Sequence, residues 1–411
     1  MTSGPITLTI DDLGAQGDGI ATHEGETVFA PLTAPGDTIT AELDHNRARL
    51  LDIITPGPDR VSPRCSHYGL CGGCSLQHIA DPAYLAFKHR TVIEALLAQR
   101  IEAPVDPVLS VPPNTRRRAT FAASRQPKIV LGFHGRRSHQ IVPIRDCAVL
   151  TPGLLALLPK LERIAGIACP PKDALTLTVT ETLTGFDVAL SGVKKGFSAD
   201  DRMRLIEAAG AAKLARISLN GEVILTRTAP AIRAGAAFLT PPPGGFLQAC
   251  LPSEAMMVKL VLEAVGSARR VADLFSGAGT FSLPLAATAT VHAVESDQPA
   301  IDALDAAARR AQGIRPITVE KRDLFRRPLM PADLKRFDAV VLDPPRAGAE
   351  DQAQQLAASA VKRVVMVSCN LQTFARDMRT LVDGGYYIDR ITPIDQFLYS
   401  PHIEIVASLS K

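Results

Sequence analysis

Regular alternation of strand and helix patterns from residue 246 onward constrains the fold more than any other feature of the sequence. The strand candidates there are RVADLF, TVHAVE, PITVEK, FDAVVLD, RVVMVSC, YYIDRITPI and IEIVASLS. Helical patterns of about ten to fifteen residues separate most of them, as in crossover connections between parallel strands. The pattern predicts an α/β domain over 246–411 that is built on a doubly wound, mainly parallel, Rossmann-like sheet.

The sequence before residue 246 has a different rhythm. Residues 5–57 alternate short apolar runs with Gly, Asp and Pro, which predicts a small antiparallel barrel. A helical pattern follows over 82–100, and strand patterns return from 117 to 245, where TPPPGG marks a boundary. We therefore expect three domains, 1–59, a β-rich central domain 60–245 and 246–411, and we expect helix 82–100 to pack on the third.

Composition excludes several classes of protein. Hydrophobic residues make up 46% of the 411 residues, which is enough for packed cores and unlike wholesale disorder. The start MTSGPITLTIDD lacks a basic segment and a long apolar run, and no stretch of about 18 uncharged apolar residues appears. We expect a cytoplasmic protein without a membrane partner, whose seven cysteines are metal ligands, nucleophiles or buried residues rather than disulfides.

Charge is distributed unevenly along the chain. Residues 11–60 carry ten acidic and three basic side chains, whereas residues 114–147 carry eight Lys or Arg and the single acid Asp146. The basic stretch also contains Phe121, Phe133 and His139. Arginines that neutralise phosphate and rings that stack on bases are the combination used for single-stranded RNA. A solvated strand face explains each residue about as well, but it explains the whole stretch less well.

Three cysteines share the spacing C-x5-C-x2-C in CSHYGLCGGC: Cys65, Cys71 and Cys74. This spacing lets three thiolates reach one metal centre, and Cys147 in PIRDCAVL is the candidate fourth ligand. Zinc is a competitor of iron–sulfur, because His67 or His78 would complete a Cys3His site. The spacing also differs from the common ferredoxin pattern. The residues alone therefore predict a metal site and leave the metal open.

A glycine-rich turn between a strand and a helix, VADLFSGAGTFSLPLA, predicts a nucleotide-type cofactor site. Gly277 and Gly279 let the backbone approach a ligand closely. Glu295 ends the next strand candidate, where a carboxylate can accept both hydroxyls of a ribose, and Asp323 is placed to meet an adenine edge. These features fit S-adenosylmethionine or NAD.

Two later motifs favour methyl transfer over hydride transfer. Asp343 ends a buried strand in DPPRAG, where stiff prolines can hold an acceptor against a planar base. Cys369 ends the following strand and precedes a helix, whose N-terminus is expected to lower the pKa of the thiol. A plain core cysteine is the competing interpretation. Glu404 starts the final strand and would, taken alone, be assigned to a solvated edge.

Together these motifs resemble the RNA uracil-C5 (5-methyluridine) methyltransferase family, in particular its iron–sulfur-containing 23S ribosomal RNA branch. The resemblance covers nearly the whole chain and rests on CSHYGLCGGCSLQH with Cys147, GGFLQ, DLFSGAGTF, DPPRAG, SCNLQTFARD and HIE. It implies that residues 1–59 form an OB-like, TRAM-type barrel and that the substrate is ribosomal RNA. It also implies that four cysteines hold a [4Fe–4S] cluster: Cys65, Cys71, Cys74 and Cys147.

The resemblance also assigns catalytic roles. The Cys369 thiolate would attack C6 of uracil and so activate C5 for methylation, after which Glu404 would remove the C5 proton. The target uridine must leave its stack to meet the thiol. The implied S-adenosylmethionine-binding residues are Gln248, Phe275, Gly277, Gly279, Thr280, Glu295, Asp323 and Asp343.

Three other functions compete with this prediction. A transfer RNA T-loop methyltransferase would share the catalytic residues, but such relatives generally lack the cysteine motif. A non-catalytic RNA-binding protein would keep the fold, although the presence of both Cys369 and Glu404 argues against it. A zinc-dependent nucleotide-binding protein would use the same cysteines. Nothing in the sequence demands more than a monomer.

Overall fold

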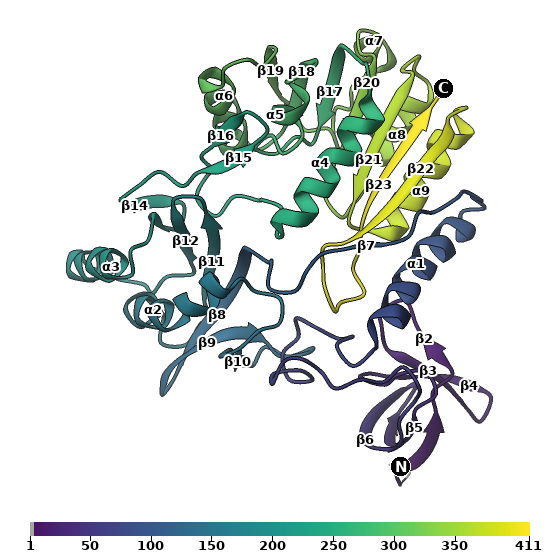
Figure 1. The fold of residues 1–411 in the computed structure, drawn as a ribbon. Coiled ribbons are helices and arrows are strands. Elements are labelled where there is room, and N and C mark those ends of the chain that lie inside the picture. Colours follow the sequence, from purple (N-terminus) through teal and green to yellow (C-terminus); the bar gives the residue numbers. More distant parts are fainter. Residues whose placement is uncertain (1–3) are drawn as a thin grey trace.

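The computed structural model describes residues 4–411. They form sheets of six, seven and eight strands and a small two-stranded sheet (Figure 1). The three large sheets follow one another along the sequence, except that one short strand from the middle of the chain joins the edge of the last sheet. The mixed α/β fold predicted from the sequence is confirmed.

The N-terminal sheet has the strand order β1-β5-β6-β4-β3-β2. Its strands are β1 (Ile6–Thr9), β2 (Asp12–Leu13), β3 (Gly19–His23), β4 (Glu26–Ala30), β5 (Thr38–Asp44) and β6 (Arg47–Thr55). Alternate residues such as Ile39 and Ala41 of β5 are fully buried, and they form a compact core with Leu8 and Val28. The period-2 pattern of the sequence therefore corresponds to strands with one buried face.

The central sheet has the order β10-β9-β8-β11-β12-β13-β14. Its strands are β8 (Arg118–Gln126), β9 (Lys128–His134), β10 (Ile141–Pro143), β11 (Leu175–Thr182), β12 (Gly185–Ser191), β13 (Arg216–Leu219) and β14 (Glu222–Thr226). Helices α2 (Pro152–Ala168) and α3 (Ala199–Ala211) share one core with this sheet. The hairpin β15 (Ile232–Ala234) and β16 (Ala237–Leu239) then leads to the last domain.

The C-terminal sheet has the order β19-β18-β17-β20-β21-β23-β22-β7. Its strands are β7 (Leu109–Ser110), β17 (Arg270–Leu274), β18 (Thr290–Glu295), β19 (Ile317–Lys321), β20 (Ala339–Leu342), β21 (Arg363–Ser368), β22 (Tyr387–Asp395) and β23 (Glu404–Ser410). The strands from β19 to β21 are parallel, whereas β23 is antiparallel to both β21 and β22. The sheet is thus mainly parallel, as the alternation predicted.

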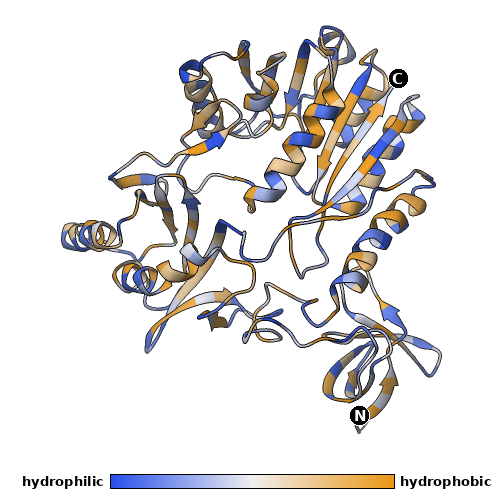
Figure 2. Ribbon diagram, viewed as in Figure 1, coloured by the Kyte–Doolittle hydropathy of each residue, from blue (hydrophilic) through white to orange (hydrophobic). Residues whose placement is uncertain are grey.

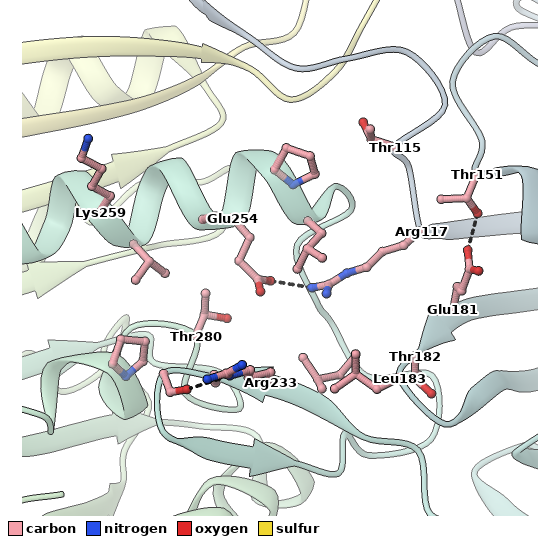
Figure 3. A pocket seen from close by; sticks show the side chains of 18 of the residues that line it. Thr115, Arg117, Thr151, Glu181, Thr182, Leu183, Arg233, Glu254, Lys259 and Thr280 are labelled. Carbon is pink, nitrogen blue, oxygen red and sulfur yellow. Dashed lines mark hydrogen bonds and ion pairs between the residues drawn. The ribbon is translucent and has the colours of Figure 1, made fainter.

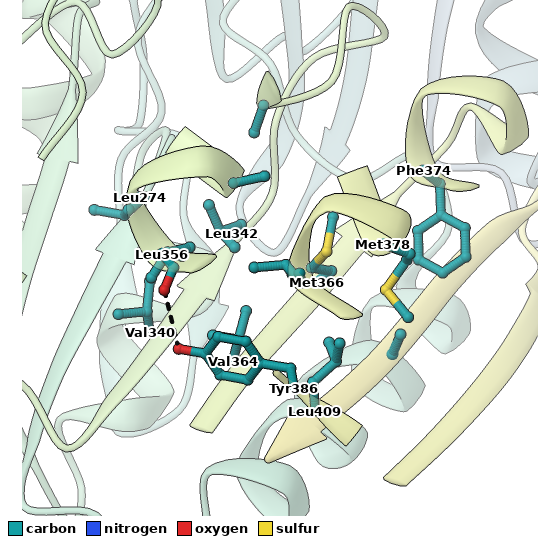
Figure 4. Packing of buried hydrophobic residues seen from close by; sticks show 14 of the residues in the cluster. Leu274, Val340, Leu342, Leu356, Val364, Met366, Phe374, Met378, Tyr386 and Leu409 are labelled. Carbon is teal, nitrogen blue, oxygen red and sulfur yellow. Dashed lines mark hydrogen bonds between the residues drawn. The ribbon is translucent and has the colours of Figure 1, made fainter. Parts of the chain in front are cut away.

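Helices cover both faces of this sheet. They are α4 (Leu251–Val265), α5 (Ser282–Leu285), α6 (Gln298–Arg310), α7 (Pro331–Leu334), α8 (Glu350–Ala357) and α9 (Leu371–Asp383). In β20, Val340 and Leu342 face the core beneath α8 and α9, whereas Ala339 and Val341 face the core beneath α4. Figure 4 shows the first of these cores, and Figure 2 shows the hydrophobic residues concentrated along the middle strands. Burial on both faces explains why these strands are continuous apolar runs.

Helix α1 (Asp81–Ala98) packs on the C-terminal domain and contacts α9 (Figure 1). Its Val92 and Leu96 belong to the core beneath α8 and α9, and β7 extends the same sheet. The other end of the helix contacts the N-terminal sheet, because Tyr84 and Phe87 pack with Leu13. No helix within residues 4–411 is both long and apolar enough to cross a membrane.

Candidate active site

Strand pairing brings three predicted residues to one edge of the C-terminal sheet. Asp343 directly follows β20, and Cys369 directly follows its parallel neighbour β21. Glu404 begins β23, which runs antiparallel to β21 with Ile405 opposite Ser368. The first residue of β23 therefore lies beside the last residues of β21. The carboxyl edge of an open α/β sheet is where such folds bind ligands.

The three groups perturb one another electrostatically. Burial raises the pKa of Glu404 to about 8, and the nearby Asp343 carboxylate adds to this. Burial, together with the nearby Asp273 carboxylate, raises the pKa of Asp343 to about 7. Perturbed carboxyl groups of this kind cluster at functional sites, because low dielectric surroundings favour the neutral acid.

The expectation that the helix N-terminus lowers the pKa of the Cys369 thiol is wrong for the unliganded chain. Burial raises this pKa, and the Glu404 carboxylate adds to the rise. Arg346 of DPPRAG opposes it, because its guanidinium lies beside the sulfur and favours the thiolate. Asn370 caps α9 by accepting a hydrogen bond from the Gln372 nitrogen, so one N–H group of the first helical turn is already engaged. Burial beside two carboxyl groups thus outweighs the helix.

A buried amide network, which the sequence did not reveal, joins Glu404 to Gln248. The Nε2 atom of Gln396 donates to the Glu404 Oε1 atom at 3.0 Å and to the Gln248 Oε1 atom at 2.9 Å. Its Oε1 atom accepts from the Ser253 hydroxyl at 2.7 Å. Gln396 follows directly after β22 and carries no motif. Only its place between a buried strand and the HIE motif could have singled it out.

The loop that carries Gln396 and ends at Glu404 is anchored by α1. Lys88 and Asp395 form an ion pair in which both side chains are fully buried. The Lys88 ammonium also donates to the carbonyl oxygens of His402 at 2.7 Å and Phe397 at 3.2 Å. Sequence reasoning missed this lysine, although its spacing of four residues from both Tyr84 and Val92, on the apolar side of the helix, was the available signal.

The same loop contacts the cysteine motif. The Tyr399 carbonyl oxygen accepts hydrogen bonds from the backbone nitrogens of Ser75 at 2.8 Å and Leu76 at 2.9 Å. These two residues directly follow Cys74, which packs with Tyr399 and Leu398. The cysteine segment is therefore in direct contact with the loop that positions Glu404.

The glycine turn after β17 forms a backbone cradle. Gly277 and Gly279 have φ values of +52° and +98°, and a Cβ atom at Gly279 would lie 2.5 Å from Leu304. The Gly277 nitrogen donates to the Glu295 carboxylate at 2.9 Å, which fixes that carboxylate beside the turn. The Phe275 ring packs tilted against Phe325 at 5.4 Å. Such a turn with an acid on the next strand fits a nucleoside cofactor.

Asp323 and Thr280 lie at the margins of this cradle. Asp323 follows β19 and accepts a hydrogen bond from the Phe325 nitrogen at 3.0 Å, so it lies close to the ring that packs on Phe275. Thr280 instead lines a separate cavity of ≈ 1170 Å³ between α4, β15 and the central sheet (Figure 3). The ion pair between Arg117 and Glu254, at 2.6 Å, crosses that cavity's wall.

The four cysteines of the predicted metal site line one hollow of ≈ 380 Å³. They are Cys65, Cys71, Cys74 and Cys147, and all four are free thiols. Burial raises the pKa of Cys74 to about 12, and the three other thiols each add to this rise, so the four are close neighbours. Arg116, Arg118 and Arg346 line the same hollow, which therefore extends toward Cys369.

The zinc alternative receives no support from the described residues. Within residues 4–411, no group of three or more His, Cys, Asp or Glu side chains is arranged to hold a metal ion, so the structure by itself supports neither a zinc site nor an iron–sulfur cluster. His67 instead pairs with Asp146 at 3.0 Å. Nδ1 of His78 hydrogen-bonds to Tyr68, and burial lowers the pKa of His78 to about 4. Both histidines are thus engaged elsewhere.

Much of the basic stretch serves the fold itself. Arg117 forms a buried pair with Glu254, and Arg136 pairs with Asp18 of the N-terminal sheet. Arg118 donates to the carbonyl oxygens of Gly244 and Gly245 at 3.1 and 3.2 Å, and Arg125 to that of Gly166 at 2.8 Å. Phe121 is fully buried and stacks on Phe133, so its predicted role in stacking on RNA bases is wrong.

Comparison with known proteins identifies the family of the chain. Residues 206–411 match the family model of tRNA (uracil-5-)-methyltransferases. An RNA methyltransferase of Rhizobium meliloti is 48% identical, and the alignment covers 98% of this chain and 99% of the relative. One from Caulobacter vibrioides is 47% identical with the same coverage.

A solved structure shares the whole architecture. The tRNA (uracil-54, C5)-methyltransferase of Pyrococcus abyssi, in complex with S-adenosyl-L-homocysteine, is 24% identical and superposes with a TM-score of 0.78 over 98% of this chain and 99% of that one. The three-sheet arrangement is therefore a fold that a solved methyltransferase also has. From its sequence relatives and its family match, the chain belongs to the tRNA (uracil-5-)-methyltransferase family and is an RNA (uracil-5-)-methyltransferase.

Proposed function

We propose that the chain transfers the methyl group of S-adenosylmethionine to C5 of a uridine in 23S ribosomal RNA, with Cys369 as nucleophile and Glu404 as base. The observation that carries this proposal is the meeting of Cys369, Glu404 and Asp343 at one sheet edge. S-adenosylmethionine as the donor is supported by the family and by the product bound to the Pyrococcus abyssi enzyme.

The chemistry follows from the needs of uracil, whose C5 is a weak nucleophile. Arg346 favours the Cys369 thiolate, which adds to C6 and places the electron pair of the C5–C6 double bond in an enolate. S-adenosylmethionine, held in the glycine cradle, would supply an electrophilic methyl group for C5 and would leave as S-adenosyl-L-homocysteine. The Glu404 carboxylate then removes the C5 proton, the electron pair restores the double bond, and the thiolate leaves.

The remaining site residues would position the two substrates. Asp343 would accept from uracil N3–H, and Gln248 would lie at the junction of base and methyl donor. The cofactor residues would be Phe275, Gly277, Gly279, Thr280, Glu295 and Asp323. The cradle fits such a ligand, because a Cβ at Gly277 would meet no protein atom within 4 Å, so this side of the turn is open, and Glu295 is held beside it.

We further propose that Cys65, Cys71, Cys74 and Cys147 hold a [4Fe–4S] cluster. Support comes from four free thiols around one hollow, a donor set that iron–sulfur clusters take. Such a cluster would supply a cross-link between the cysteine motif and the end of the basic stretch. Iron and sulfide analysis of anaerobically purified protein tests this. Cys74→Ser should lose the iron, and Cys169→Ser, which changes a buried thiol outside the hollow, should keep it. Stoichiometric zinc would refute the cluster.

The domain limits belong to the same proposal. Residues 1–59 would be the OB-like, TRAM-type barrel, 60–245 the central domain and 246–411 the catalytic domain. The six-stranded sheet of Ile6–Thr55 supports the first limit. The contacts of α1 and β7 with the C-terminal domain support the expectation that helix 82–100 packs on the catalytic domain. RNA would reach the site across the arginines that line the cysteine hollow.

Methyl transfer to purified RNA tests the function. The wild type and the Cys369→Ser, Glu404→Gln and Cys169→Ser variants are given labelled S-adenosylmethionine with ribosomal RNA or transfer RNA that lacks 5-methyluridine. We expect label in 23S RNA with the wild type and Cys169→Ser, and none with Cys369→Ser. Glu404→Gln should retain methylated RNA as a covalent adduct. Label in transfer RNA alone would refute the ribosomal target and favour a T-loop uridine instead.

A further inference from the structure

Gln396 occupies the centre of the buried polar network at the sheet edge. Its side-chain amide contacts Glu404 and Gln248 through nitrogen and Ser253 through oxygen, at 2.7–3.0 Å. All four residues are buried, with relative exposures of 0–4%. Both donor hydrogens and the acceptor of the amide are thus engaged, as buried polar groups require.

The donor and acceptor properties of these groups fix the direction of each bond. An ionised carboxylate can only accept, so the amide nitrogen of Gln396 faces Glu404 when Glu404 is charged. The same nitrogen turns the Gln248 oxygen toward Gln396, and the Gln248 nitrogen is left to face elsewhere as a donor. The Ser253 hydroxyl on α4 holds the other end of the Gln396 amide. One side chain therefore sets the orientation of two site residues.

We propose that Gln396 is a positioning residue that holds Glu404 as the proton acceptor and orients the amide of Gln248. This rests on the function proposed above. A donor beside a carboxylate stabilises its charged form, and the hydrogen bond from Gln396 does this for Glu404. Removing the donor therefore impairs the step in which Glu404 takes the C5 proton, and it leaves the earlier attack of Cys369 less affected.

Other charged groups also face Glu404. Asp343, which follows β20, raises the pKa of Glu404. Arg346, in the loop after Asp343, lowers the pKa of Glu404. The Cys369 thiol, after β21, feels the Glu404 charge in return. These groups belong to other elements and stay in place when residue 396 changes. A shift in the titration of the variant therefore reports the loss of the Gln396 amide.

Two substitutions separate the hydrogen bonding of the Gln396 side chain from its size and shape. Gln396→Glu keeps the size and places a second carboxyl next to Glu404, and Gln396→Leu removes all hydrogen bonding. Gln352 is the matched control, because it is equally buried but hydrogen-bonds the backbone of Leu329. Gln352→Glu and Gln352→Leu therefore test the general cost of losing a buried glutamine. Circular dichroism checks that every variant is folded.

The experiment measures single-turnover methylation of 23S ribosomal RNA from pH 6 to about pH 10 and the fraction of methylated RNA that remains covalently bound. We expect both Gln396 variants to release product about ten- to a hundredfold more slowly than the wild type, as the loss of one hydrogen bond to a charged group implies. The methylated covalent adduct should accumulate in these variants. Their rate of product release should rise at a higher pH than that of the wild type. The Gln352 variants should behave like the wild type.

The outcomes distinguish this inference from the proposed function. If the wild type methylates uridine, and the Gln396 variants have the same pH profile as the wild type and accumulate no adduct, the positioning role is refuted. The proposed function is then unaffected. Equal slowing of the Gln396 and Gln352 variants without an adduct also overturns the positioning role. If the wild type forms no 5-methyluridine in any RNA, the proposed function itself fails.

Discussion

Replacing Lys88 with methionine removes the cation that anchors the loop between β22 and β23. The ion pair of Lys88 with Asp395 has no solvent exposure on either side, and the ammonium donates to two loop carbonyl oxygens as well. Lys88→Met therefore leaves the Asp395 carboxylate buried in the protein interior without its cationic partner. Breaking a buried pair from one side costs about 3–5 kcal/mol, far more than an exposed pair is worth.

A double-mutant cycle shows where this energy comes from. Lys88→Met with Asp395→Leu removes the buried charge but leaves the carbonyl oxygens of Phe397 and His402 without the ammonium donor. We expect the double variant to lose only about 1–3 kcal/mol, less than Lys88→Met alone. Lys259→Met is the control, because Lys259 pairs with Glu263 on the exposed face of α4 and should change stability by about 0.5 kcal/mol or less.

Urea denaturation of the wild type, Lys88→Met, Asp395→Leu, the double variant and Lys259→Met gives the free energies of unfolding. We expect the effects of the two substitutions on the free energy of unfolding to be coupled, so that the double variant is more stable than Lys88→Met. A Lys88→Met variant that loses less than about 1 kcal/mol would refute the argument. So would a double variant whose loss equals the sum of the two single losses, because the charges would then not interact.

Three further predictions follow from single contacts. Because burial raises the pKa of Glu404 to about 8, its basic form increases as pH rises, and the release of methylated RNA from the covalent adduct in a single turnover should speed up from about pH 7 to about pH 9. Gly132→Ala would place a Cβ atom 1.8 Å from the Val142 carbonyl oxygen and should cost about 2–4 kcal/mol in urea denaturation, whereas Gly210→Ala, with no atom within 4 Å, should be neutral or stabilising. Asp18→Ala removes the partner of Arg47, Arg136 and Arg137 and should speed amide exchange in the loop between β9 and β10; unchanged exchange there would show that these ion pairs do not hold the loop.

The fold class followed from local patterns. Continuous apolar strands separated by helical segments predicted the C-terminal sheet, because strands buried on both faces cannot alternate with polar residues. Asp343 and Cys369 were placed correctly at strand ends for the same reason. The order of the strands along the sequence did not show that β23 lies between β21 and β22 in the sheet. It therefore did not predict that Glu404 lies beside Cys369.

The pKa of Cys369 and the role of the basic stretch show the limits of local reasoning. A helix N-terminus predicted a lower pKa, but burial beside Glu404 raises it. Charge counting predicted an RNA-binding face, but Arg117 and Arg136 are neutralised by carboxylates from other domains. In each case the deciding neighbour comes from a distant segment, and nothing in the local sequence identifies it.

The sequence by itself determined the chemistry that the chain can carry: the thiol, the carboxylates, the glycine turn and the four cysteines. Only the tertiary structure decided which of these groups share an environment. Gln396 and Lys88 belong to no motif. The Gln396 amide nevertheless joins Glu404 to Gln248, and the Lys88 ammonium fixes the loop between β22 and β23. The physical reason is that pKa values and hydrogen bonds depend on distance and burial, which long-range packing sets and local sequence does not record.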